Sequence, residues 1–539
     1  MVELLANEKQ SHNFKQNNNV DKKKSTKLEE NKKGIINSAK NNKETINLEE
    51  SNNLNSFSKL RSILFPIYNY EFKLFFTISL FLFAILFNQN ILRILKNSII
   101  ISEISVEVTS FIKVYFVTPV AALLVILYAN LVNRMSLFKI FYILISIFTA
   151  FYLIFGFILY PNLEIFHLSQ DNTKILMQEY IYIKWFIAML ANWSYIIFYT
   201  ASEMWPNMFY ILIFWQICNH ISTVDQASRF YRILVLLGNS AVIIAGFVMQ
   251  KLSSSTSFIF EALMIQNNNQ NLIKISSLII LINSIIACFC VYYIAKKSKT
   301  DKFNIKLAPK LGIKESLQYI TKSKYLWMML ICSAAFGLTM NLIEGLWYSQ
   351  IKEAYPDLNG YTEYSSIYVM WTGLTIMFFT IFSGILMKFF GWFITTLMTP
   401  IIILITGVIF FMFTIFGNQI NSVLGFTGEI LSFTILIGSI QNIISKGVKY
   451  SIWDSFREML YLPLDKELKT KGKAAVDLLS SKIGKSLSSI LQSILFTLMP
   501  DATYNSLASF MIVFFIISCF AWIVALFNIR TEYNALIQK

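Results

Sequence analysis

Long apolar segments separated by short polar ones follow each other from about residue 73 to about residue 528. A helix of about 20 apolar residues crosses the ~30 Å hydrocarbon core of a bilayer. The pattern therefore predicts an all-α polytopic membrane protein with twelve spans. These spans are expected at about 73–99, 107–132, 137–160, 182–222, 229–251, 273–296, 325–350, 364–391, 393–416, 425–460, 473–499 and 505–528.

The fourth and tenth segments, 182–222 and 425–460, are too long for one straight crossing. Each is expected to be tilted, broken or continued outside the bilayer. Dividing the fourth segment in two would give thirteen spans instead of twelve. Lysine-rich loops favour the cytoplasmic side, and 296–324 and 463–473 are such loops, whereas 252–272 has no Lys or Arg. Only twelve spans place the lysine-rich loops and both termini on one side, which is predicted to be cytoplasmic.

Composition supports this class of protein. The chain has 539 residues, of which 55% are hydrophobic and 14% charged, against about 45–50% and about 25% in soluble domains. The Asn- and Lys-rich residues 1–62 cannot bury enough apolar surface to fold and predict a disordered cytoplasmic tail. The expected organisation is then a six-helix bundle at 63–296, a basic cytoplasmic linker at 297–324, a second six-helix bundle at 325–530 and a cytoplasmic C-terminus at 531–539.

The two bundles resemble each other in sequence. "NQNILRILKNS" at 88–98 lies in the first span, and "TMNLIEGLWYS" at 339–349 lies in the seventh. Asn90 then matches Asn341, and Arg93 matches Glu344. Two six-span halves in parallel repeat predict the major-facilitator fold, in which the substrate site lies between the halves near the membrane midplane.

Charged residues inside the spans are the candidate site. A charge at mid-bilayer costs roughly 2.5–3.5 kcal/mol on insertion scales, so such residues are functional candidates. The alternative is structural, with ion pairs between helices or side chains that extend to the headgroups. That alternative is favoured for Lys113 and Lys388, near span ends. For the polar Asn239, a hydrogen bond between helices explains its position as well as substrate contact does. The predicted substrate-binding residues are Arg93, Lys96, Glu203, Asn239, Glu344, Lys446 and Lys485.

Basic residues in the spans outnumber acidic ones, which favours an anionic cargo such as a phosphorylated one. The five cysteines lie in apolar segments and the three histidines are scattered, so neither a metal nor a cofactor is expected. Gly484-Lys485-Ser486 matches the end of a P-loop, which would indicate an ATP-hydrolysing enzyme. Leu479 stands where the first P-loop glycine is needed, and we do not predict an enzyme. A membrane scaffold that transports nothing is a further alternative.

Several stretches resemble the ATP/ADP translocases of plastids and obligate intracellular parasites. They are "FNQNILRILKNS", "FWQICNHISTVDQASRFY", "NLIEGLWYSQIKEAYP", "SKGVKYSIWDSFREMLYLPLDKELKTKGKAAVD" and "GKS". The resemblance implies exchange of external ATP for internal ADP by alternating access, without hydrolysis. Relatives also include proton-coupled net importers of purine nucleotides, which is the alternative function.

The resemblance also assigns residues. The family's functional lysines fall on Lys96 and Lys485, its acidic residues on Glu203 and Glu344, and its nucleotide-linked asparagine on Asn239. We expect Lys96 to bind phosphate and Glu344 to pair with a basic neighbour in the empty carrier. The sequence departs from the family at three places that put strict ATP/ADP selectivity in doubt: Asn97 replaces the usual aspartate, Pro206 interrupts the fourth span, and Leu487-Ser488 replace glycines.

The expected partners are ATP and ADP as substrates and the lipid bilayer, with no nucleic acid, and the protein is expected to be a monomer. The Asn- and Lys-rich tail is typical of an AT-rich parasite genome, which favours a microsporidian member. The expected location is the plasma membrane of an intracellular parasite, with a mitosome or another organelle envelope as the alternative.

Overall fold

A computed structural model describes residues 67–68, 70–222, 224–254, 268–297, 320–321, 323–424, 429–465, 468 and 472–537. The predicted tail at 1–62 and most of the predicted linker at 297–324 lie outside the described residues. Lys73–Lys539 form one compact unit, separate from Met1–Phe72, and the architecture given below is that of this unit. Its regular elements are all helices in the part of the chain that the structure describes.

The first half of the unit runs from α3 to α14 and corresponds to the first six predicted spans. Its elements are α3 (Phe72–Glu103), α4 (Val108–Ile112), η1 (Lys113–Val117), α5 (Thr118–Arg134), α6 (Leu137–Ile154), η2 (Phe155–Leu159), η3 (Tyr160–Asn162), α7 (Leu163–Phe166), α8 (Gln170–Glu179), η4 (Ile181–Ile183), α9 (Lys184–Ala191), α10 (Trp193–Trp205), η5 (Pro206–Phe214), α11 (Trp215–Ile221), α12 (Val224–Ser253) and α14 (Asn269–Lys297). Three of them, η1, η2 and η5, are π-helical.

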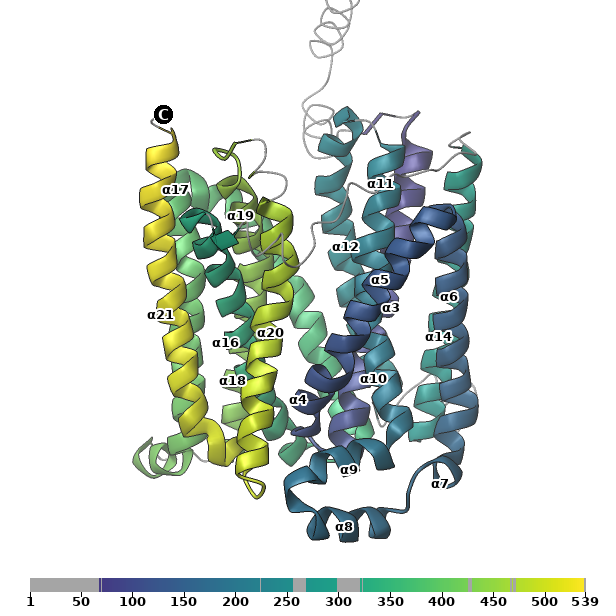
Figure 1. Cartoon of the computed structure of the whole chain (residues 1–539), viewed down its shortest axis with the longest axis vertical. Coiled ribbons are helices and arrows are strands. Elements are labelled where there is room, and N and C mark those ends of the chain that lie inside the picture. Colours follow the sequence, from purple (N-terminus) through teal and green to yellow (C-terminus); the bar gives the residue numbers. More distant parts are fainter. Residues whose placement is uncertain are drawn as a thin grey trace, which may run out of the picture. The chain divides into compact units, whose positions relative to one another are not determined.

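The second half runs from α16 to α21, and Figure 1 shows the two halves as two groups of upright helices. Its elements are α16 (Lys324–Ala354), α17 (Leu358–Leu424), α18 (Ile430–Val448), η6 (Lys449–Trp453), α19 (Asp454–Leu460), α20 (Lys473–Leu498) and α21 (Tyr504–Ile537). The eighth and ninth predicted spans both lie in α17, which turns at Gly391 with a φ of 71°. Only glycine adopts this backbone conformation without strain, so Gly391 marks the boundary between the two spans.

The described part of the chain has nine helices long and apolar enough to cross a membrane, or ten when one bent pair counts as a span. The bent pair is the fourth predicted span, in which Ile181–Ala191 and Trp193–Ile221 meet at 78°. The expectation that this segment is tilted, broken or continued outside the bilayer is therefore confirmed. Two further spans make up the twelve that were predicted. One is obtained when α17 is divided at its turn, and the other is α20, whose apolar part, Ile483–Leu498, is shorter than a full membrane span.

Aromatic side chains fill the interior of each half. In the first half, the Phe155 and Phe198 rings stack with centroids 4.3 Å apart, and Trp205 lies 4.3 Å from Phe209. In the second half, the Trp453 and Trp522 rings meet edge to face at 5.2 Å. Such pairs add about 0.5–1.5 kcal/mol to the gain from burial alone. Each half thus has an aromatic core of its own.

Glycine allows the two halves to approach closely where α12 packs against α17. A Cβ atom added to Gly246 of α12 would lie 2.8 Å from both the Met370 nitrogen and the Ser366 oxygen of α17. One added to Gly373 would lie 2.8 Å from the Ile243 side chain. Because two of these clashes are with backbone atoms, a larger residue at Gly246 cannot be accommodated by a rotamer change. Small residues at such crossings are typical of packed membrane helices.

Gly246→Val is expected to force α12 and α17 apart and to destabilise the protein by about 1–3 kcal/mol. Gly384→Val in α17 is the matched control, since a Cβ at Gly384 meets no atom within 4 Å. Thermal unfolding of the two purified variants in detergent measures the difference. Equal melting temperatures for the two variants would contradict this account of the α12–α17 crossing.

Candidate functional site

Two buried lysine–glutamate pairs form the centre of the candidate site. Lys96 of α3 lies 2.7 Å from Glu203 of α10, and Lys446 of α18 lies 2.5 Å from Glu344 of α16. The lysine side chains are 8% and 6% exposed, whereas the carboxylates keep 29% and 20% of their surface. The first pair joins the first and fourth spans, and the second joins the seventh and tenth. The halves therefore carry corresponding pairs, with the positions of the two charges exchanged.

A π-helical segment follows the charged residue in both the fourth and the tenth span. Segment η5 begins at Pro206, within one turn of Glu203, and η6 begins at Lys449, within one turn of Lys446. Proline has no N–H to donate, so the regular helical hydrogen-bond pattern cannot continue through Pro206. π-Helical turns occur frequently at functional sites, because they displace the backbone next to the residue that acts.

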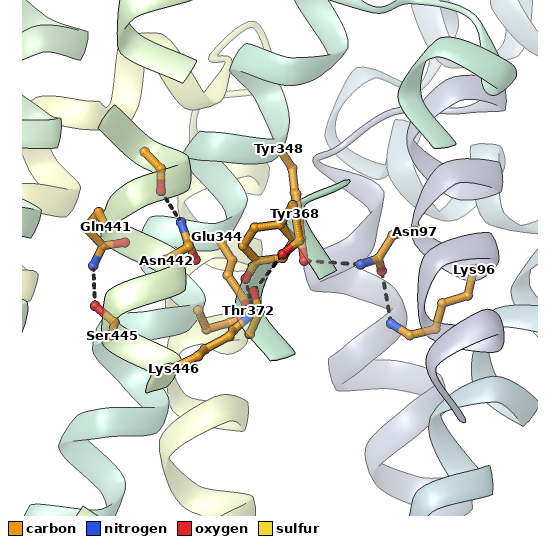
Figure 2. Close-up of polar contacts among 12 residues, drawn as sticks. Lys96, Asn97, Glu344, Tyr348, Tyr368, Thr372, Gln441, Asn442, Ser445 and Lys446 are labelled. Carbon is orange, nitrogen blue, oxygen red and sulfur yellow. Dashed lines mark hydrogen bonds and ion pairs between the residues drawn. The ribbon is translucent and has the colours of Figure 1, made fainter. Parts of the chain in front are cut away.

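The paired lysines use further contacts of their own half. Lys96 also donates a hydrogen bond to Asn97 Oδ1 at 2.9 Å and lies 4.1 Å from the centre of the Tyr199 ring. Lys446 also donates to the Tyr368 hydroxyl at 2.6 Å. Figure 2 shows Lys96 beside Asn97, and Lys446 beside Glu344 and Tyr368. An ammonium group has three donors, so most of the binding capacity of both lysines is already used in this conformation.

Arg93 and Lys485 differ from these lysines. The structure gives neither side chain a hydrogen bond or an ion pair within the described residues. Lys485 is exposed although it lies midway along α20, and it interacts electrostatically with Glu203, Glu344 and Arg93. Arg93 is half-buried and interacts with Glu344. One cation from each half therefore remains available to a ligand beside the two ion pairs.

Lys113 lies in the same cluster, although the sequence favoured a structural role for it near a span end. Its Nζ donates to Asn341 Oδ1 of α16 at 2.5 Å, and it interacts electrostatically with Glu344 and Glu203. The π-helical segment η1 begins at this residue. Sequence analysis had already selected Glu344 in this region of α16, and Asn341 through its match with Asn90, but nothing in the sequence indicated the contact with Lys113.

Asn239 is half-buried on α12 and has no side-chain hydrogen bond among the described residues. It lies one turn before Val242 and Ile243, which pack against Gly373 of α17. The structure gives Asn239 no contact with the charged cluster, and its assignment to the substrate site stays a prediction.

The segment Gly484-Lys485-Ser486 lies inside the continuous helix α20. A P-loop needs an irregular glycine-rich loop in front of its helix, and this segment has no such loop. Gly484 instead permits close packing, because a Cβ atom there would collide with the backbone of Ala334 in α16. Ser486 Oγ lies 3.3 Å from Thr118 Oγ1 of the first half. The sequence match to a P-loop is therefore coincidental.

The halves contact each other beside the ends of α3 and α16. Lys352 in the last turn of α16 donates to the Ser102 carbonyl at the end of α3, at 2.7 Å. In return, the Glu107 carboxylate accepts from the backbone N–H of Tyr504, the first residue of α21. A cation at a helix C-terminus and an anion at a helix N-terminus are both favourable.

A helical membrane protein with two similar halves and a basic cluster between them has the architecture of a major-facilitator-like carrier. The fold is similar to that of a bacterial homologue of the iron transporter ferroportin in an inward-facing state, with a TM-score of 0.59 and 10% identity over 85% of this chain and 98% of the other. It is also similar to the nucleoside transporter NupG, with a TM-score of 0.51 and 11% identity over 84% of this chain and 99% of the other. At these identities the likeness concerns the fold alone.

Sequence relatives define the family. Residues 50–533 match the family model described as TLC ATP/ADP transporter. The chain is 47% identical to ADP,ATP carrier protein 5 of Rickettsia felis over 88% of this chain and 97% of the relative. It is 36% identical to ADP,ATP carrier protein 3 of Rickettsia prowazekii over 89% of this chain and 99% of the relative. The chain therefore belongs to the TLC ATP/ADP transporter family, a family of transporters and not of enzymes.

Removing one member of a buried ion pair is expected to lower the stability of the protein more than removing both members. Glu344→Gln leaves the Lys446 charge buried without its carboxylate and should destabilise the protein by about 3 kcal/mol. The double variant Glu344→Gln/Lys446→Met should recover most of this loss, because no unpaired charge remains. Glu532→Gln, which removes the partner of the exposed Lys324, is the control and should cost at most about 1 kcal/mol. Thermal unfolding in detergent ranks the variants, and a double variant less stable than Glu344→Gln would contradict the prediction.

Proposed function

We propose that this chain exchanges external ATP for internal ADP across a membrane by alternating access, without hydrolysing either nucleotide. The observation that carries the proposal concerns two cations from opposite halves, Arg93 and Lys485. Neither side chain has a hydrogen bond or an ion pair within the described residues, and both interact electrostatically with carboxylates of the two ion pairs. Charge-assisted bonds from lysine and arginine are the strong contacts to phosphate. The names of the Rickettsia relatives support ATP and ADP as the cargo.

The two ion pairs give the carrier a way to distinguish the empty from the loaded state. In this conformation, Glu203 and Glu344 hold Lys96 and Lys446 within their own halves. A polyphosphate bound by Arg93 and Lys485 would compete with these carboxylates for the two lysines. The displaced carboxylates can be hydrated, because each keeps part of its surface exposed. Substrate then connects the halves through its own oxygens, and the halves rock around it.

The site and the membrane setting complete the proposal. Substrate-binding residues are Arg93, Lys96, Glu203, Asn239, Glu344, Lys446 and Lys485, to which Lys113 is now added because of its contact with Asn341. The cytoplasmic tail, linker and C-terminus keep the limits predicted from the sequence, and the working unit is a monomer in the lipid bilayer.

The source and the membrane remain predictions from composition. The Asn- and Lys-rich tail favours a microsporidian source, whereas the relatives named above are proteins of Rickettsia. A protein that imports energy belongs in the plasma membrane of an intracellular parasite, and an organelle envelope such as that of a mitosome is the alternative.

Exchange can be tested with purified protein in proteoliposomes. Labelled ATP should enter much faster when the liposomes contain ADP than when they contain no nucleotide, because only a loaded carrier returns. Uptake that is indifferent to internal nucleotide would contradict exchange, and its abolition by a protonophore would establish proton-coupled net import instead. Release of phosphate from ATP by the wild type, lost in Lys485→Ala, would show an enzyme.

The role of the cations without a partner can be tested by nucleotide binding in detergent. Arg93→Ala and Lys485→Ala should each weaken ATP binding roughly 10- to 150-fold, the loss of one charge-assisted bond of about 1.5–3 kcal/mol. Lys324→Ala is the control, since Lys324, the first residue of α16, is exposed and pairs with Glu532 of α21. Wild-type affinity in Lys485→Ala would show that this lysine does not bind phosphate.

A further inference from the structure

Asn97 connects the two halves at the centre of the site. It follows Lys96 on α3, is buried, and accepts a hydrogen bond from Lys96 Nζ at 2.9 Å through its side-chain oxygen. Its side-chain nitrogen donates to the Tyr348 hydroxyl of α16 at 3.1 Å. Figure 2 shows Asn97 between Lys96 and Tyr348. One amide therefore joins the Lys96–Glu203 pair of the first half to the second half.

The second half receives this contact close to its own ion pair. Tyr348 lies one helical turn after Glu344, so the two side chains share a face of α16. Trp347 beside it packs on Tyr368 with ring centroids 4.5 Å apart, and the Tyr368 hydroxyl accepts from Lys446. Asn97 thus lies on a continuous set of contacts that runs from Glu203 to Lys446.

The absence of charge on Asn97 is the important property. The Lys96 ammonium has Glu203 as its one carboxylate partner among the described residues, and the Asn97 oxygen is a weaker, neutral acceptor. An aspartate at this position could accept from both Lys96 and the Tyr348 hydroxyl, so the geometry alone does not require asparagine. Such an aspartate would, however, hold Lys96 with a second charge-assisted bond, roughly twice as strong as a neutral one.

We propose that Asn97 is a positioning and specificity-determining residue. It orients Lys96 towards Glu203, and because it is neutral it allows the ammonium group to exchange its bond with Glu203 for a bond with a substrate phosphate. The proposal rests on the nucleotide exchange proposed above. With a neutral residue 97, the net charge of the site is one unit more positive than it would be with an aspartate. Because ATP carries one more negative charge than ADP, residue 97 affects ATP binding more than ADP binding.

The test is nucleotide binding to purified, full-length variants in detergent, with ATP and ADP measured separately. Asn97→Asp should weaken ATP binding about 10-fold or more, the loss of one charge-assisted contact, and should weaken ADP binding less. The double variant Asn97→Asp/Glu203→Gln restores one carboxylate and one amide around Lys96 and should recover most of the ATP affinity. A purely structural role for Asn97 would not produce this recovery, nor a change in the ratio of ATP to ADP affinity.

Two controls and one reference variant separate charge from geometry. Tyr348→Phe removes the bridge between the halves without a change in charge and should leave the ratio of ATP to ADP affinity unaltered. Asn528→Asp makes the same substitution on α21, where Asn528 bonds only its own helix, and should have no effect. Glu203→Gln alone is the reference for the double variant: it removes the carboxylate that competes with phosphate for Lys96 and should tighten ATP binding. Weaker ATP binding in Glu203→Gln would contradict the idea that Glu203 competes with phosphate.

Equal loss of ATP and ADP binding in Asn97→Asp, or no loss, would overturn the proposal, as would a double variant that stays as weak as Asn97→Asp. If Asn97→Asp does not fold, ATP binding is compared between Glu203→Gln and the double variant Asn97→Asp/Glu203→Gln. The proposal requires the double variant to bind ATP more weakly than Glu203→Gln, because the two differ only in the added aspartate. Wild-type exchange in proteoliposomes is measured in parallel. Its absence would contradict the proposed function without changing what the binding data say about Asn97.

Discussion

The cost of placing charge inside a membrane is the constraint on which the site depends. Each lysine or glutamate near mid-bilayer costs roughly 2.5–3.5 kcal/mol on insertion scales, and the protein reduces this cost by pairing Lys96 with Glu203 and Lys446 with Glu344. Since each pair joins two helices of one half, the pairs also fix how α3 packs with α10 and α16 with α18. Within the described residues, the Arg93 and Lys485 side chains have no ion pair or hydrogen bond, which is tolerable only where solvent or a ligand reaches them.

Ion pairs and hydrogen bonds have different places in this architecture. Every ion pair among the described residues joins two groups of the same half. The described side-chain hydrogen bonds between the halves each include at least one neutral group. Examples are Asn97–Tyr348, Lys113–Asn341 and Thr118–Ser486. Breaking a contact of this kind does not leave unpaired buried charges of both signs and therefore costs less than separating a buried ion pair. The distribution suits two stable halves that separate and rejoin.

The corresponding π-helical segments add to this picture. Both η5 and η6 lie within one turn of the charged residue that the fourth or tenth span contributes, and η1 begins at Lys113 itself. A helix with local π geometry can shift its hydrogen-bond register at lower cost than a regular one, because its pattern is already interrupted. The residues that would exchange partners on substrate binding therefore lie where the backbone is least regular.

The sequence by itself determined the class of protein, the approximate positions of most of the spans and the irregularity of the fourth one, because apolar length and the cost of buried charge act locally along the chain. It also selected Lys96, Glu203, Glu344, Lys446 and Lys485 as unusual, since charges within apolar segments are visible without a structure. The exchange function came from the resemblance of particular stretches and not from composition. Packing in three dimensions decided which charges are paired. Lys96 and Glu203 lie far apart in the chain, and whether they meet depends on how α3 packs against α10. For the same reason, the contact of Lys113 with Asn341 and the bridge from Asn97 to Tyr348 became visible only when two halves distant in sequence were brought together.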